Sequence, residues 1–122
     1  MIRVVRLGSP RASGEGLRLG TVRRPPRGVK KSEFARRDYY DVWLPDLAPS
    51  PRLIAKAHRD WSVFVKAYRR EMSLPAAQRL LELLARLSHD ADFSVGCYCE
   101  DEQRCHRSIL RQLLEENGAR LS

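Results

Sequence analysis

The segment from Phe93 to Leu114 reads FSVGCYCEDEQRCHRSILRQLL, and it joins two kinds of secondary structure. Residues 93–98 are a short aromatic and β-branched run, which predicts a buried strand. Apolar residues then recur at helical spacing over 109–114 and stop before Asn117-Gly118, a pair typical of a helix C-terminus. All three cysteines and His106 therefore lie where a strand gives way to a helix, the place where open α/β folds bind ligands.

The rest of the chain alternates strand and helix patterns around this junction. Strands or extended segments are predicted over residues 2–7, 17–23, 39–44 and 93–98, and helices over 51–58, 60–72, 75–87 and 105–116. Start signals precede the helices, such as Ser50 followed by Pro51 and, further on, Asp60 and Ser73. This order predicts an α/β fold with a small, mainly parallel central sheet of the Rossmann type.

Length and composition limit what such a fold can be. We expect a chain of 122 residues to form one domain, 1–122, with one core and a single cleft. No apolar run approaches the roughly 20 residues of a membrane span, and no signal peptide precedes the first strand pattern. We therefore expect a cytoplasmic protein without a membrane partner, whose oligomeric state the sequence does not indicate. Three cysteines are too few, and odd in number, for a disulfide scaffold.

The net charge of +8 is concentrated in the first third of the chain. Residues 1–37 hold nine Arg and two Lys against Glu15 and Glu33, whereas the remainder is nearly balanced. Such a block is either a solvated face or an anion-binding surface. A nucleic-acid-binding module would use these residues as one continuous face: Arg3, Arg6, Arg11, Arg18, Arg24, Lys30 and Lys31. Because no aromatic residue lies between Met1 and Lys31, base stacking by this segment is disfavoured, and we prefer a cleft.

Several blocks resemble a known family. Pro26-Arg27-Gly28-Val29, the Trp43–Ser50 block WLPDLAPS and the spaced residues Trp61, Phe64, Tyr68 and Glu71 follow one another in its order. Together they resemble the YeaO-like branch of a prokaryotic domain-of-unknown-function family. The resemblance implies a compact three-layer α/β domain, in agreement with the element order, and it implies no activity.

The wider family also has a cysteine and Cys-His-Arg signature, which Cys97 and Cys105-His106-Arg107 resemble. Carried over, that signature implies a site at these residues, with Arg23 and Arg27 as facing partners. One departure is that the YeaO-like pattern usually has Asp before the arginine at position 23, where this chain has Val22. A role that depends on that acidic residue is therefore not carried over.

The first interpretation of the cysteine and histidine cluster is an anion site. The unpaired N–H groups and positive dipole at a helix N-terminus favour a phosphate or carboxylate. Arg23, Arg27 and Arg107 would bind the anion, and Cys105, with a thiol pKa lowered by the helix, and His106 would be the candidate catalytic pair. The ligand would be a small phosphate-bearing or nucleotide-like molecule, with no cofactor, and the protein is an enzyme only if that pair acts on it.

Two other interpretations stay open. Cys97, Cys99, Cys105 and His106 are ligand types that zinc accepts, or thiols for redox chemistry. Cys-x-Cys spacing is tight for zinc, however, and adjacent residues diverge by about 100° on a helix, so we expect no stoichiometric zinc. The third interpretation is structural: Cys97 is a small core residue, and His106 and Arg107 tie the helix start to the acidic run 100–102.

Overall fold

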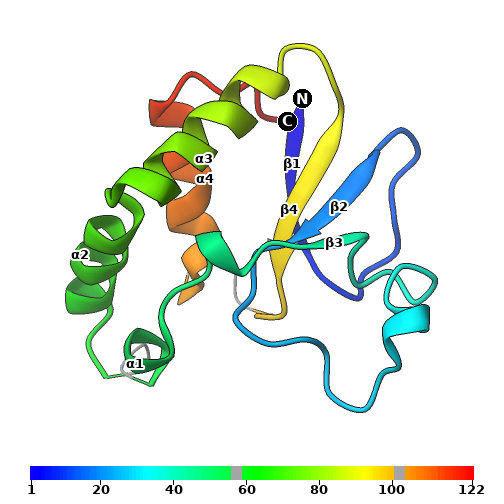
Figure 1. Ribbon diagram of the computed structural model, residues 1–122, viewed down its shortest axis with the longest axis horizontal. Helices are drawn as coiled ribbons and strands as arrows, with labels where there is room; N and C mark the ends of the chain where they lie inside the picture. The colour runs from blue at the N-terminus through cyan, green and yellow to red at the C-terminus, as the bar shows by residue number, and fades with distance from the viewer. Residues whose placement is uncertain (56–58, 101–103) are drawn as a thin grey trace.

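A four-stranded parallel sheet forms the centre of the molecule. The computed structural model describes residues 1–55, 59–100 and 104–122. The strands, in spatial order, are β1 (Ile2–Arg6), β4 (Phe93–Cys97), β2 (Leu17–Gly20) and β3 (Val42–Trp43), and every neighbouring pair is parallel (Figure 1). The predicted α/β fold with a small, mainly parallel sheet is confirmed, since four α-helices accompany this sheet.

Strand β4 lies between β1 and β2, and all five of its residues are buried. Val95 pairs with Val4 on one side and Leu19 on the other, so the apolar run of the sequence is the middle of the sheet. Cys97 ends this strand with a side chain that is 1% exposed. The prediction of a buried central strand before the cysteine cluster is therefore confirmed.

The α-helices form one layer beside the sheet (Figure 1). They are α1 (Pro51–Ile54), α2 (Trp61–Met72), α3 (Pro75–Leu87) and α4 (His106–Glu116). Their apolar stripes form one buried cluster with Ile2, Phe93 and Val95 of the sheet. No helix in the described parts of the chain is long and apolar enough to cross a membrane.

Helix boundaries agree with the start signals in two of three cases. The Ser50 side chain accepts a hydrogen bond from the Leu53 N–H, and Asp60 caps α2 through the N–H groups of Ser62 and Val63. Ser73, in contrast, ends α2, and the residue before Pro75 in α3 is Leu74, whose side chain makes no cap. Helix α1 ends at Ile54, and residues 56–58 of the predicted helix lie outside the described chain.

The opposite face of the sheet is covered by connecting loops instead of α-helices. The loop before β2 and the segment after it, which includes the 3-10 helix η1 (Lys31–Glu33), run along this side (Figure 1). A second 3-10 helix, η2 (Pro45–Leu47), follows β3. The third layer of the implied architecture is therefore a loop layer.

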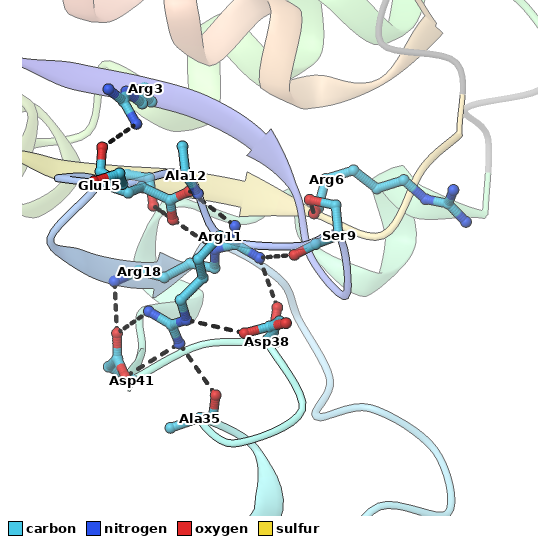
Figure 2. A network of polar contacts seen from close by, with 12 residues as sticks. Arg3, Arg6, Ser9, Arg11, Ala12, Glu15, Arg18, Ala35, Asp38 and Asp41 are labelled. Carbon is cyan, nitrogen blue, oxygen red and sulfur yellow. Dashed lines mark hydrogen bonds and ion pairs between the residues drawn. The ribbon is translucent and has the colours of Figure 1, made fainter.

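Buried charges hold this loop layer to the sheet (Figure 2). The guanidinium of Arg18, fully buried on β2, donates to both carboxylate oxygens of Glu15, at 2.8 and 2.9 Å. Its Nη1 donates to the carbonyls of Ser9 and Asp38, and the Ser94 hydroxyl of β4 donates to Glu15. The positive charge of Arg18 therefore serves the structure and is not on the surface.

Candidate functional site

A cavity of about 350 Å³ opens at the carboxyl edge of the sheet. Its walls come from the end of β4, the start of α4, the segment after β2, and helices α1 and α2. The lining residues are Val22, Arg23, Arg24, Pro49, Pro51, Ile54, Trp61, Phe64, Cys97, Tyr98, Cys99, Arg104, Cys105 and His106. The cavity therefore lies where the strand-to-helix junction of a parallel sheet predicts a ligand site.

Cys105 lies immediately before α4. It is the N-cap residue, with extended backbone angles (φ −130°, ψ 148°), whereas the sequence predicted a place within the first turn. Its extended backbone takes the thiol off the helix surface and toward β4, where its Sγ lies 2.6 Å from the Sγ of Cys97. Both thiols are buried, in a small cluster with Leu7, Val22 and Tyr40.

Cys99 completes a group of three thiols. The Sγ atoms of Cys97, Cys99 and Cys105 all lie within 4.8 Å of one another, and Cys99 is the exposed member. Hydrogen bonds with Cys105 and then Cys97 lower the pKa of Cys99, because they stabilise its thiolate form. A negative charge on the Cys99 thiol, which lines the cavity, is therefore favoured.

The expected low pKa of Cys105 is wrong. Its hydrogen bond with Cys97 does lower the pKa of Cys105, but its hydrogen bond with Cys99 and its burial outweigh that contribution and raise the pKa to about 12. The pKa of Cys97 is raised as well, first by its hydrogen bond with Cys105, then by that with Cys99, and also by burial. Burial among other thiols thus overrides the effect of the helix N-terminus at Cys105.

His106 is buried in one fixed tautomer. Its Nε2 lies 2.7 Å from the carbonyl oxygen of Thr21, which can only accept a hydrogen bond, so Nε2 carries the proton. Burial lowers the pKa of His106 and keeps the ring neutral near pH 7. The unprotonated Nδ1 lies 3.8 Å from the Sγ of Cys105, and the ring packs edge-on against Tyr68. This nitrogen can accept a proton or bind a metal ion.

The three predicted anion-binding arginines occupy different places. Arg23 lines the cavity, and its guanidinium also donates to the carbonyls of Ala48 and Pro49, which fixes the segment before α1. Arg27 lines a neighbouring hollow together with Arg24 and Tyr98. Arg107 is 5% exposed and does not line the cavity, although it directly follows His106. The structure therefore brings Arg23 together with Cys105 and His106, and leaves Arg27 and Arg107 outside the cavity.

Comparison with known families agrees with the sequence blocks described above. The family profile described as "Active DUF488-N3 subclade" matches residues 2–118 of the chain. The chain belongs to this DUF488 family. Comparisons with curated proteins and with solved structures found no match. The earlier YeaO-like resemblance is thus confirmed at the level of the family, and DUF488 membership brings no ligand or activity with it because the domain is one of unknown function.

Several cavity residues of this DUF488 chain were missed by sequence reasoning. Trp61 and Phe64 were interpreted as core only; Phe64 does belong to the core, yet both also form a cavity wall. Arg24 and Arg104 are exposed and line the cavity. Arg24 had been considered only as part of the basic N-terminal block, and Arg104 had not been considered. The position of Arg104 directly before Cys105 was a usable signal, whereas the approach of α2 to the sheet edge could not be inferred from periodicity.

Proposed function

We propose that the cavity binds a small phosphate-bearing, nucleotide-like anion and that Cys105 and His106 face its reacting part. The observation that carries this proposal is that two chemically different sets of residues line one cavity. The residues from α1, α2 and the segment before α1 are apolar or aromatic and are called its aromatic end; the segments after β2 and before α4 contribute Arg23, Arg24 and Arg104, which are called its basic end. A nucleotide has the same division, with a flat ring at one end and a charged group at the other.

The aromatic end supports a planar ring as part of the ligand. Trp61 and Phe64 are stacked, with ring centroids 5.0 Å apart and planes inclined by 16°. Ile54, Pro49 and Pro51 add apolar surface beside them. A heteroaromatic ring that lies against Trp61 would gain stacking and bury apolar area.

The basic end supports an anionic group. Arg24 and Arg104 are exposed on the cavity rim, so their guanidinium groups can turn toward a phosphate or carboxylate. Helix α4 begins there, and the positive end of its dipole favours an anion. Arg23 and the buried Arg107 add positive charge nearby, and Arg27 extends the basic surface into the neighbouring hollow.

Chemistry on the bound molecule would fall to the Cys105–His106 pair. The neutral Nδ1 of His106 is the base within reach of the Cys105 thiol, and the hydrogen bond to Thr21 keeps that nitrogen unprotonated. Because the pKa of Cys105 is raised, its thiol stays protonated near pH 7. Attack on the ligand would therefore need His106 to take that proton as the new bond forms.

Thermal unfolding in the presence of adenosine monophosphate, adenosine or inorganic phosphate tests the proposal. A ligand that binds only the folded state stabilises it by about 2.7 kcal/mol at one hundred times its Kd. We expect the monophosphate to raise the melting temperature more than either fragment. Trp61→Ala and Arg104→Gln should each remove most of the shift.

Arg79→Gln is the matched control for Arg104→Gln, because Arg79 is an exposed arginine on α3 that does not line the cavity. The control should keep the full shift. An equal loss in both arginine variants would mean diffuse surface charge, and no shift with any of the three compounds at millimolar concentration would contradict the proposal.

A further inference from the structure

We propose that Cys97, Cys99 and Cys105 form a binding site for a thiophilic metal ion, zinc above all, at the basic end of the cavity. Three thiolates would hold the ion, and its fourth position would face the cavity. Thiolate sulfur selects zinc and other soft ions over magnesium or calcium. Three protein ligands with one open position are the arrangement of catalytic zinc sites.

The spacing of the sulfur atoms supports this site. Around a tetrahedral zinc ion with Zn–S bonds of about 2.3 Å, the sulfur atoms lie about 3.8 Å apart. The three Sγ atoms here lie within 4.8 Å of one another, and those of Cys97 and Cys105 are 2.6 Å apart. Small side-chain rotations would therefore bring all three sulfurs to the separation that zinc needs.

Fixed backbone positions hold two of the three ligands. Cys97 is the last residue of the central strand β4, and Cys105 is the N-cap of α4, which packs on that strand. Cys99 follows Cys97 by two residues and is exposed, so it can close over an ion from the cavity side. A site on two rigid elements loses little conformational entropy when the ion binds.

His106 provides the supporting group expected beside such a site. Histidines near metal ions usually donate one ring N–H to a carbonyl or carboxylate, which fixes the direction of the other nitrogen. His106 donates in this way to Thr21, and its Nδ1 lies 3.8 Å from the Sγ of Cys105. That nitrogen is placed to bind the ion or to accept a hydrogen bond from water on it.

Nearby charges also suit the ion. Three thiolates and one divalent cation leave a net charge of −1, which the guanidinium groups of Arg104 and Arg107 can offset from the start of α4. The spacing objection to zinc assumed that Cys105 and His106 both project from the helix. Because Cys105 is extended and precedes α4, that divergence does not apply.

This site does not depend on the proposed nucleotide-like ligand. The ion would bind to the thiols with the rest of the cavity empty, and a phosphate could later occupy its open position. With an ion bound, Cys105 is a ligand and not a free thiol. Metal binding and thiol chemistry at Cys105 therefore exclude one another, and the metal content of the protein distinguishes them.

Metal content and cobalt spectroscopy on the full chain test the inference. Protein purified under reducing conditions without chelator should carry one zinc per chain by elemental analysis. After chelation, one equivalent of Co²⁺ should give a thiolate-to-cobalt charge-transfer absorption, and one equivalent of Zn²⁺ should abolish it. Zinc should also protect Cys99, the exposed thiol, from iodoacetamide.

Cys99→Ser is the decisive variant, because Cys99 is exposed and its replacement leaves the buried packing intact. It should weaken zinc affinity by more than the roughly 10–100-fold that loss of a supporting residue causes. His89→Ala, which removes an imidazole that contacts the Gly118 carbonyl instead of the thiols, should bind zinc as the unaltered chain does. Unchanged affinity in Cys99→Ser, or reduced protein that takes up no zinc or cobalt, would overturn the inference, as would a Cys97–Cys105 disulfide that persists in reductant.

Discussion

At the scale of single residues, the Glu15–Arg18 ion pair is the most consequential contact outside the cavity. Both side chains are buried, and Glu15 also accepts hydrogen bonds from Ser94 and from the Ala12 N–H (Figure 2). Glu15→Gln would leave the Arg18 charge buried and uncompensated, so we expect a loss of about 3–5 kcal/mol in the free energy of unfolding by urea.

Glu33→Gln is the control for that substitution. Glu33 pairs with Arg36, whose side chain is exposed, and such surface pairs contribute about 0–1 kcal/mol. A similar cost for both substitutions would mean that burial of the Glu15–Arg18 pair does not matter.

The same carboxylate makes stability depend on pH. The hydrogen bond from Arg18, aided by that from Ser94, lowers the pKa of Glu15 from 4.5 to about 2. Between these pH values the unfolded chain binds a proton that the folded chain does not. The contribution of Glu15 is therefore fully present above about pH 4.5 and is lost as the pH falls toward 2.

Unfolding free energies measured from pH 6 to pH 2 would test this dependence. The difference between the unaltered chain and Glu15→Gln should shrink as the pH falls through this window. A difference in unfolding free energy that stays constant with pH would mean that the pKa of Glu15 is not lowered in the folded protein.

Residue types and spacing located Cys97, Cys105 and His106 at one strand-to-helix junction, because the apolar pattern of residues 93–98 is specific for a buried strand. Residue types and spacing could not predict which of the three thiols is deprotonated. The pKa of Cys105 depends on Cys97 and Cys99, whose approach is a matter of tertiary structure. The nucleic-acid-binding alternative needed Arg18 on an exposed face. Its burial follows from its pairing with Glu15, which forms only when the loop folds over the sheet.

At the scale of elements, the short helix α1 owes its position to Ser50. The Ser50 hydroxyl accepts from the Leu53 N–H and donates to Glu71 of α2, and the Ser50 N–H donates to the same carboxylate. Ser50→Ala removes the cap and one link to α2, so we expect a loss of about 0.5–2 kcal/mol by urea unfolding.

Ser62→Ala is the matched control near the start of α2, where the hydroxyl donates to the exposed Asp60 and, among residues 1–55, 59–100 and 104–122, to no other side chain. It should change stability far less than Ser50→Ala. Because α1 carries Pro51 and Ile54 of the cavity wall, Ser50→Ala should also reduce the ligand-induced rise in melting temperature. Equal effects of both alanines on stability would contradict the assigned cap.

Elements with strong local signals were predictable, and those fixed by tertiary contacts were less so. The N-cap residue Asp60 predicted where α2 begins. The apolar stripe of α2 predicted its buried face, which includes Phe64 and Tyr68. The strand predicted over 17–23 ends earlier, at Gly20. Tyr40 packs so closely against this glycine that a Cβ there would lie 2.3 Å from its ring, a contact that the sequence does not reveal. The loop layer on the second face had no periodicity from which to infer it.

At the scale of the whole molecule, the positive charge is less available for nucleic acid than the composition suggests. Arg18 is buried, and Arg11 donates to Asp38 and Asp41. We therefore expect only weak binding of single- or double-stranded oligonucleotides, with a Kd at or above the roughly 10⁻⁶–10⁻⁴ M of non-specific binding at physiological salt. Fluorescence anisotropy across a salt series checks this, and nanomolar binding at physiological salt would favour the nucleic-acid-binding module instead.

A crystal structure of the complex with adenosine monophosphate would show whether the carboxyl-edge cavity binds a nucleotide-like anion. We expect the adenine ring against Trp61 and the phosphate within hydrogen-bond distance of Arg24 or Arg104, beside the start of α4. Adenosine monophosphate bound elsewhere, such as on the loop of Lys30 and Lys31, with this cavity empty at a saturating concentration, would contradict it.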